Sequence, residues 1–282
     1  MLNVFYDVSS YGANTRGPTK VVKNLLQALS DCDIPYSDNK EVYDRNIFLG
    51  WDDVTLASYN SLQNKDNVLI GPQIWPWDPR WEYLKEIQYT KVIAPSHWVE
   101  NKLNKFWPEV RTGVWPAPIY TPDIENNIKY DCLVYYKNRS EQDISSIVQF
   151  LNQKGVSFVG LQYGNYNPND FRECLSEVKY CLIVDNTESQ GIAIQEMMAV
   201  NKPMLVWDVK EWDHMGETYK VPATSVPYWS EDCGEKFYEL SELDDTFERF
   251  CANIDRYNSK KLVDSELSNK ISVKKLLSLF EE

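Results

Sequence analysis

Short apolar runs alternate with segments of helical periodicity along most of the chain, and this alternation constrains the fold more than any other feature. Strands that alternate with helices are typical of a parallel sheet, because each helix carries the chain back to begin the next strand in the same direction. The first unit has an apolar run at residues 2–6, a polar loop at 9–17 and an amphipathic segment at 18–29 with proline in its first turn. The sequence therefore predicts an α/β fold.

A proline-containing stretch, residues 110–123, separates two series of such units. Pro116, Pro118 and Pro122 exclude a continuous helix there, and polar residues follow at 125–129, so we expect a linker. Before it we predict strands at 46–50, 67–71 and 91–94 and a helix at 96–106. After it we predict strands at 131–136, 156–161, 180–184 and 203–207 and helices at 142–153, 169–177 and 191–200. This pattern predicts two Rossmann-like domains, 1–122 and 123–282.

The remaining segments are less regular. Residues 212–229 are rich in aromatic and turn residues and show no clean period, so no structure is predicted for them. Residues 237–280 have helical character, and the last helix is a candidate to pack back on the N-terminal domain.

The charge of the chain limits its partners. Forty-two acidic against 29 basic residues give a net charge of −13, which would repel nucleic acid and anionic membranes, so a bound phosphate needs a local basic pocket. No stretch reaches the roughly 18 apolar residues of a membrane span, and the first residues do not resemble a secretory signal. Six scattered cysteines and two histidines indicate neither a zinc site nor a disulfide framework. We expect a cytoplasmic protein with no nucleic-acid partner and no transmembrane segment.

The most informative segment is TESQGIAIQEMMAVNKPMLVWD, residues 187–208, which follows one predicted strand and ends in another. Glu188 precedes a predicted helix and Glu196 lies eight residues further on, up to about 12 Å away, so one molecule could contact both. The amides at the start of this helix, together with the helix dipole, suit a diphosphate, and a glycine lets the backbone approach it closely. The amides concerned belong to Ser189, Gln190, Gly191 and Ile192.

Two isolated glutamates would more often be a helix cap and a solvent-exposed acid, and it is the surrounding segment that favours a binding site. With its Ser-x-Gly after Glu188 and its proline-containing turn into the next strand, the segment resembles the Glu-x7-Glu signature of retaining GT-B glycosyltransferases (glycosyl transferases group 1). The resemblance implies a GT-B fold, with two Rossmann-like domains facing across a cleft. It also implies that Glu196 binds the ribose hydroxyls of the donor, and that Glu188, the catalytic candidate, contacts the donor sugar near the reacting carbon.

The resemblance further implies an arginine and a lysine that bind the donor diphosphate. Lys137 and Arg139 are the candidates, although they lie closer together than in the family pattern, and solvated loop charges are the alternative. Tyr163 and Gly164 follow another strand, where Tyr163 or Tyr166 could stack on the base, and an ordinary core or turn role is equally open.

Candidates in the N-terminal domain are less specific. The loop at residues 11–19 resembles the family's glycine-containing loop, which makes Arg16 and Gly17 donor-binding candidates, with an ordinary loop as the alternative. Trp75 and Trp77 lie in a proline-rich segment and could stack on an acceptor glycan, or could simply pack on the surface. His97 is an acceptor-side candidate, and either His97 or His214 could assist a reacting hydroxyl.

The resemblance, together with the cations and helix amides of the segment, implies a metal-independent glycosyltransferase that needs no cofactor. Its substrates would be a nucleotide diphosphate sugar (UDP or GDP) and a hydroxyl of a glycan or other acceptor, with retention at the anomeric carbon. The alternatives are a catalytically silent binding protein for sugar nucleotides or glycans, and a GT-B-fold epimerase or hydrolase of sugar nucleotides. The sequence predicts neither the donor sugar, the base, the acceptor nor the oligomeric state.

Overall fold

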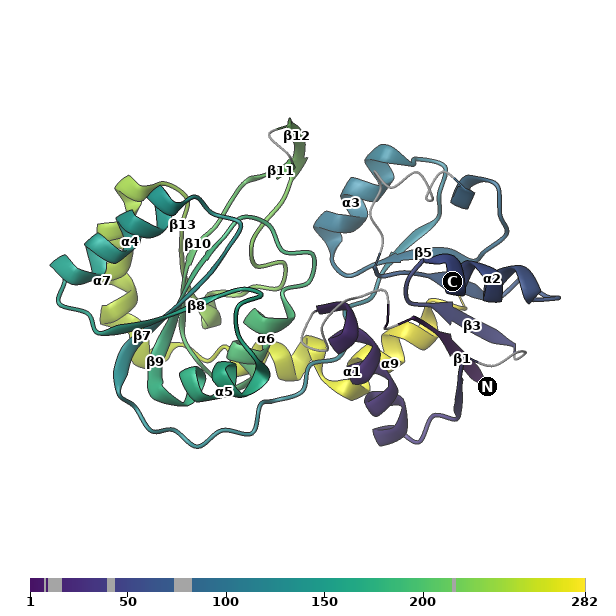
Figure 1. The fold of residues 1–282 in the computed structure, drawn as a ribbon, viewed down its shortest axis with the longest axis horizontal. Helices are drawn as coiled ribbons and strands as arrows, with labels where there is room; N and C mark the ends of the chain where they lie inside the picture. Colours follow the sequence, from purple (N-terminus) through teal and green to yellow (C-terminus); the bar gives the residue numbers. More distant parts are fainter. Residues whose placement is uncertain (8, 10–16, 40–43, 74–82, 215–216, 282) are drawn as a thin grey trace. The chain divides into compact units, whose positions relative to one another are not determined.

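The computed structural model describes residues 1–7, 9, 17–39, 44–73, 83–214 and 217–281 (Figure 1). The chain forms two compact units. The N-terminal unit comprises Met1–Ile119 and Glu266–Glu282, and the C-terminal unit comprises Tyr120–Ser265. The sequence-based division lay between residues 122 and 123, and it assigned the C-terminal segment to the second domain with its last helix free to pack on the first.

The N-terminal unit is built on a parallel sheet with the strand order β2-β1-β3-β4-β5-β6. Its strands are β1 (Leu2–Phe5), β2 (Tyr36–Asp38), β3 (Arg45–Phe48), β4 (Val68–Ile70), β5 (Lys91–Ala94) and β6 (Thr112–Val114). Its helices are α1 (Gly17–Asp31), α2 (Asp53–Ser61), α3 (His97–Phe106) and α9 (Asn269–Ser278).

Strand β6 corrects the prediction that residues 110–123 form only a linker. Val92 and Ala94 of β5 pair with Thr112 and Val114, which makes β6 an edge strand of the sheet. The prolines that excluded a helix begin at Pro116, after the strand has ended, so they are compatible with it.

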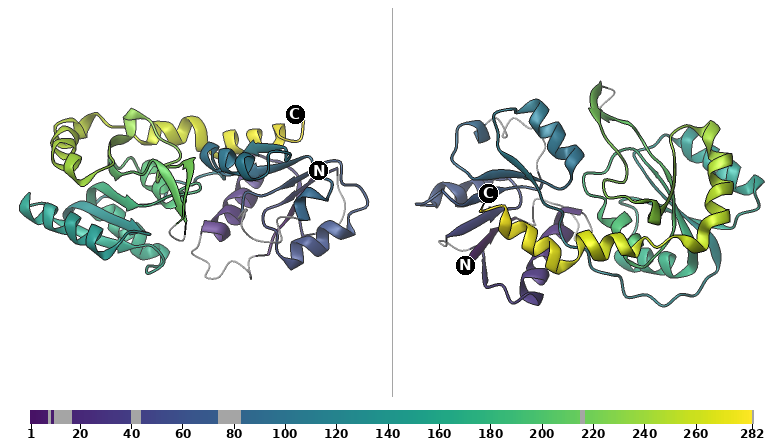
Figure 2. Two further views of the ribbon diagram at one scale, coloured as in Figure 1. Left: turned by 90° about the horizontal axis from the view of Figure 1, so that it is seen from above. Right: turned by 180° about the vertical axis from the view of Figure 1, so that it is seen from behind.

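Helix α9 belongs to the N-terminal unit, where it packs beside α1 (Figure 2). Trp115 Nε1 donates a hydrogen bond to the carbonyl of Ser272 at 3.1 Å, and Ser272 Oγ donates to the carbonyl of Pro116 at 2.7 Å. A side chain at Gly113 would lie 2.9 Å from a Leu279 methyl group. The end of the chain therefore packs closely on the segment that follows β5.

The C-terminal unit contains a second parallel sheet, with the order β13-β10-β9-β7-β8. Its strands are β7 (Tyr130–Lys137), β8 (Phe158–Gln162), β9 (Val178–Asp185), β10 (Met204–Trp207) and β13 (Gly234–Phe237). Its main helices are α4 (Glu141–Gln153), α5 (Pro168–Glu177), α6 (Ile192–Ala199) and α7 (Leu243–Asn253), and the short α8 (Lys260–Leu262) follows.

The predicted strands and helices of this unit are confirmed to within a few residues at their ends. The segment at 212–229, for which nothing was predicted, contributes most of an antiparallel hairpin, β11 (Glu211–His214) and β12 (Glu217–Pro222). Strand β13 was also not foreseen. Its four residues are partly polar, with Glu235 and Lys236 between Gly234 and Phe237, so they lack the apolar run that marks the other strands.

Helices cover both faces of the second sheet. Helices α4 and α7 lie on one side, and α5 and α6 lie on the other (Figure 1). On the first side, Ile147 and Leu151 of α4 and Phe247 and Phe250 of α7 are buried in one core with strand residues such as Leu182. Burial of this apolar surface holds the helices against the sheet.

The strand order creates a switch point in this sheet. The chain passes from β7 to β8 on one side of β7, and then crosses to β9 on its other side. Connections from neighbouring strands therefore diverge at the carboxyl ends of β7 and β9, which is where open α/β sheets bind their ligands. Lys137 and Asp185, the last residues of the two strands, are register partners at this point.

No helix in the described part of the chain is both long enough and apolar enough to cross a membrane.

Candidate functional site

An ion pair lies at the switch point of the C-terminal sheet. Lys137 ends β7, Glu188 lies in the loop after β9, and Lys137 Nζ is 2.5 Å from Glu188 Oε1. Their side chains are only 18% and 12% exposed. Burial by itself lowers the pKa of Lys137, but the negative charge of Glu188, which also accepts a hydrogen bond from Lys137, outweighs it and raises that pKa above the ordinary value. Lys137 is thus a cation held at the carboxyl end of the sheet.

Asp185, which the sequence analysis did not single out, completes this cluster. It is the last residue of β9, and its side chain is fully buried. Burial raises the pKa of its carboxyl group well above the ordinary value, and the negative charge of Glu188 raises it further, against the opposing effect of Lys137. The signal in the sequence was an acid at the end of the otherwise apolar segment YCLIV, residues 180–184.

The loop that carries Glu188 leads directly into helix α6. Gly191 occupies the N-cap position with φ of +80°, a left-handed conformation that favours glycine, and it has no side chain that could make a capping hydrogen bond. Just before it, Gln190 is buried and exchanges hydrogen bonds with Gln195: its Nε2 donates to Gln195 Oε1 at 3.0 Å, and Gln195 Nε2 donates to its carbonyl at 3.1 Å. This bridge fixes the turn, and Ser189 and Ile192 are the flanking residues.

The negative charges of Glu188 and Glu196 both affect the pKa of one tyrosine, Tyr166. Burial raises the pKa of Tyr166 to about 12, and the charges of Glu196 and Glu188 contribute to that shift. The Tyr166 ring stacks on Phe171 with centroids 5.7 Å apart, and its hydroxyl lies 3.5 Å from that of Tyr135. The structure therefore brings the two predicted acids to one region, although they lie on different parts of the loop and helix.

Tyr163 and Gly164 follow β8 on the same edge of the sheet. The Tyr163 amide donates a hydrogen bond to the carbonyl of Tyr136 at 3.0 Å, and Lys137 Nζ lies 4.3 Å from the centroid of the Tyr163 ring. Tyr163 is 36% exposed, and Gly164 has φ of +85°. The ring thus contacts the site cation while part of its surface faces solvent.

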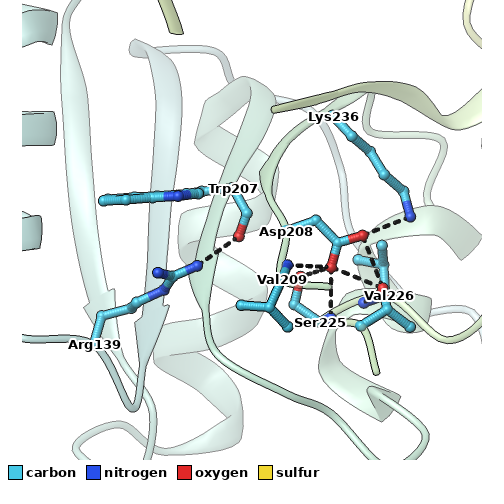
Figure 3. Close-up of polar contacts among 8 residues, drawn as sticks. Arg139, Trp207, Asp208, Val209, Ser225, Val226 and Lys236 are labelled. Atoms are coloured by element: carbon cyan, nitrogen blue, oxygen red, sulfur yellow. Dashed lines mark hydrogen bonds and ion pairs between the residues drawn. The ribbon is translucent and has the colours of Figure 1, made fainter. Parts of the chain in front are cut away.

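Arg139 makes its contacts with the ends of two strands, and Figure 3 shows the contact with Trp207 at the end of β10. Its Nε donates to the carbonyl of Asp185 at 2.8 Å, its Nη2 donates to the carbonyl of Trp207 at 3.2 Å, and its guanidinium carbon lies 4.3 Å from the centre of the Trp207 ring. Burial lowers the pKa of Arg139. These contacts tie the loop after β7 to β9 and β10, and diphosphate binding by the remaining N–H groups of Arg139 stays a prediction.

A second buried acid, Asp208, organises the loop behind Glu188 (Figure 3). Its carboxylate accepts hydrogen bonds at 2.8 to 3.0 Å from the Val209 amide, Thr224 Oγ1, the Ser225 amide and Ser225 Oγ, and it pairs with Lys236 Nζ at 2.8 Å. The carbonyl of Thr224 then accepts a hydrogen bond from the Glu188 amide at 3.1 Å. Sequence reasoning missed this network, because its members lie on separate segments.

The candidates of the N-terminal unit are only partly described. Gly17 is the first residue of α1 and is half-buried. His97 is the first residue of α3, its side chain is 77% exposed, and its Nδ1 lies 3.4 Å from Glu100 Oε2. Arg16, Trp75 and Trp77 lie outside the described residues, and so does the side chain of His214 at the end of β11. Among the described residues, no three His, Cys, Asp or Glu side chains gather as a metal site.

The sequence matches no protein-family model and no curated protein sequence. Solved structures, however, share the fold. The lipopolysaccharide outer core galactosyltransferase WaaB matches with a TM-score of 0.64 at 9% identity, over 99% of this chain and 98% of its own. Sucrose-phosphate synthase from Thermosynechococcus elongatus matches with a TM-score of 0.60 at 10% identity, over 99% and 98% of the two chains.

A mutant of TarM from S. aureus, solved with fondaparinux, alpha-GlcNAc-glycerol and UDP, matches with a TM-score of 0.56 at 10% identity. The match covers 93% of this chain and 59% of the TarM chain, so the present chain spans less than two thirds of that protein. At these identities the likeness shows the fold. The chain has the α/β GT-B fold of glycosyltransferases, with two Rossmann-like units.

Proposed function

We propose that this protein is a glycosyltransferase that moves a sugar from a nucleoside diphosphate sugar to a hydroxyl group of a glycan or other acceptor. The observation that carries the proposal is the largely buried Lys137–Glu188 ion pair at the switch point, beside the N-terminus of α6 with its left-handed Gly191. The GT-B fold supports it, and so does the UDP bound in the TarM structure.

The leaving diphosphate would bind at the N-terminus of α6. The amides of the first helical turn and the helix dipole attract anions, and the left-handed Gly191 presents no side chain toward a bound phosphate. Lys137 supplies a full positive charge, and a phosphate would compete with Glu188 for it. Because these groups can stabilise the departing diphosphate, we propose a reaction that needs no metal ion or cofactor.

The two glutamates would then have separate tasks. Glu196, in the second turn of α6, would bind the ribose hydroxyls of the donor. Glu188 would contact the donor sugar near the reacting carbon and stabilise the transition state with retention of configuration. Tyr163, which is partly exposed and lies beside Lys137, would stack on the base.

The first test is binding. Isothermal titration with UDP, GDP and ADP should show that one of them binds, and Glu196→Ala should weaken that binding about 10-fold or more through the loss of charge-assisted hydrogen bonds. Glu173→Ala is the matched control, since Glu173 is an exposed acid on α5. If no nucleotide binds the wild type, or if Glu196→Ala binds as the wild type does, the donor-site assignment is wrong.

The second test is turnover of the matching nucleotide sugars with a panel of sugar acceptors. The proposed reaction is supported if the wild type releases the nucleoside diphosphate and forms a glycoside of unchanged anomeric configuration. Glu188→Gln should abolish this turnover. Free sugar as the main product would indicate a hydrolase, and an altered sugar still attached to the nucleotide would indicate an epimerase. Binding without turnover of any donor would indicate a binding protein.

A further inference from the structure

The carboxyl group of Asp185 has an unusual environment for an acid. Its side chain is 0% exposed, and Oδ1 accepts a hydrogen bond from the Asn186 amide at 2.7 Å. Its other oxygen, Oδ2, is buried, and no donor group among the described residues reaches it. An ionised carboxylate with one unsatisfied oxygen in this position would be strongly unfavourable.

The carboxyl group of Glu188, three residues further along the chain, lies close enough to that of Asp185 to raise its pKa. Two ionised carboxylates have only acceptor oxygens, so they repel each other and cannot form a hydrogen bond. One proton between them changes a repulsion into a strong, charge-assisted hydrogen bond. The proximity of these two acids therefore indicates that the pair holds a proton.

The surroundings decide which acid carries it. Glu188 pairs with Lys137 Nζ at 2.5 Å and keeps 12% of its side-chain surface exposed, so its negative charge is compensated. Asp185 is buried, and the other groups near it would compensate a negative charge on its carboxyl group less well. Arg139 donates its hydrogen bond to the main-chain carbonyl of Asp185. The hydroxyl of Tyr135 stays neutral, because burial raises its pKa. The charge is therefore most stable on Glu188 and the proton on Asp185.

We propose that Asp185 is a positioning residue, which keeps its proton at neutral pH and donates it in a hydrogen bond to the ionised carboxylate of Glu188. Glu188 is then held from two directions, by the cation of Lys137 and by the acid of Asp185. The role of this arrangement in catalysis rests on the proposed function. When a bound diphosphate draws Lys137 away from Glu188, the hydrogen bond from Asp185 still holds the Glu188 carboxylate in place and ionised.

The proposal can be tested on the free protein, without any ligand. Aspartate and glutamate carboxyl carbons are labelled with carbon-13, and the resonances of Asp185 and Glu188 are assigned by their loss in Asp185→Asn and Glu188→Gln. The Asp185 resonance should keep the chemical shift of a protonated acid from about pH 5 to about pH 7. Asp131 is the internal control, because hydrogen bonds from Lys179 and Ser157 lower its pKa and keep it ionised. Ionisation of Asp185 in the ordinary range of an aspartic acid would overturn the proposal.

Substitution of Asp185 gives a second test, because a neutral and an ionised Asp185 predict opposite changes in the pKa of Glu188. If Asp185 is a neutral donor, Asp185→Ala removes a hydrogen bond to the charged form of Glu188, so the pKa of Glu188 should rise by about one unit. Asp185→Asn should restore most of that shift, since its amide N–H can also donate. If Asp185 is ionised instead, both variants remove a like charge and the pKa of Glu188 falls, which refutes the proposal. A wild type that binds no nucleotide would refute the proposed function, while these titrations would still decide the role of Asp185.

Discussion

The backbone amide of Glu188 donates a hydrogen bond to the carbonyl of Thr224, 3.1 Å away. Thr224 in turn donates its hydroxyl proton to Asp208, whose carboxylate also binds Ser225 and Lys236. The proposed catalytic glutamate is thus held in place by a buried acid of a different loop. Figure 3 shows this acid at the centre of its hydrogen-bond network.

We therefore predict that Asp208→Asn destabilises the protein by about 2–4 kcal/mol, because it leaves Lys236 without its partner and breaks several hydrogen bonds to a charged group. Urea unfolding measures the loss. Hydrogen exchange should also become faster at the Glu188 amide. The control is Asp131→Asn, whose ion pair with Lys179 is partly exposed and should be worth less than about 1 kcal/mol. Unchanged exchange at Glu188 in Asp208→Asn would show that Asp208 does not support that loop.

A second prediction concerns Lys137. Lys137→Met leaves Glu188 without its cation, so we expect a loss of about 2–4 kcal/mol in unfolding free energy and an affinity for the bound nucleoside diphosphate lower by about 10-fold or more. Titration calorimetry and urea unfolding give the two quantities. Lys179→Met is the matched control, since Lys179 lies near the opposite end of β9 and is 57% exposed. Equal effects in the two variants would contradict the special role of Lys137.

Substitution of Gly191 can separate the effect of backbone strain on stability from the effect of ligand contact on affinity. Gly191→Ala places a side chain at φ of +80°, which should cost about 1–2 kcal/mol of stability. Gly155→Ala should cost a similar amount, because Gly155 has φ of +68° and open space around it. Only Gly191→Ala should also weaken binding of the nucleoside diphosphate, since its methyl group lies at the N-terminus of α6. Equal affinities in the two variants would argue against a phosphate at this turn.

Asp185 predicts a characteristic dependence of stability on pH. Its pKa is raised in the folded protein, so between the unfolded and folded pKa values the folded state binds more protons and becomes less stable as pH rises. Asp185→Asn cannot ionise, so the stability of this variant relative to wild type should increase with pH above about pH 4, by up to about 1.4 kcal/mol per pH unit. Urea unfolding of both proteins across this range measures the difference. A difference that is independent of pH would mean that Asp185 has an ordinary pKa.

Much of this site could be predicted from local patterns. The apolar runs at the positions of β7 and β9 and the helical period of α6 depend on neighbouring residues alone, so the sequence located Lys137, Glu188 and Gly191 at strand ends and at a helix start. The same local reasoning missed β6 and β13, which are short and lack a strong pattern of their own. Such strands form because a neighbouring strand supplies hydrogen bonds.

The sequence by itself determined the α/β class, the order of most elements and the segment that carries Glu188 and Glu196. Only the tertiary structure decided which charges meet. Asp185 becomes part of the site because β9 lies beside β7, and Asp208 reaches Lys236, 28 residues further along the chain, because β13 pairs with β10. Arg139, predicted as a phosphate ligand, contacts the ends of β9 and β10 for the same reason. The energy of a buried charge depends on the groups that surround it in space, and strand order and register, rather than local sequence, determine those groups.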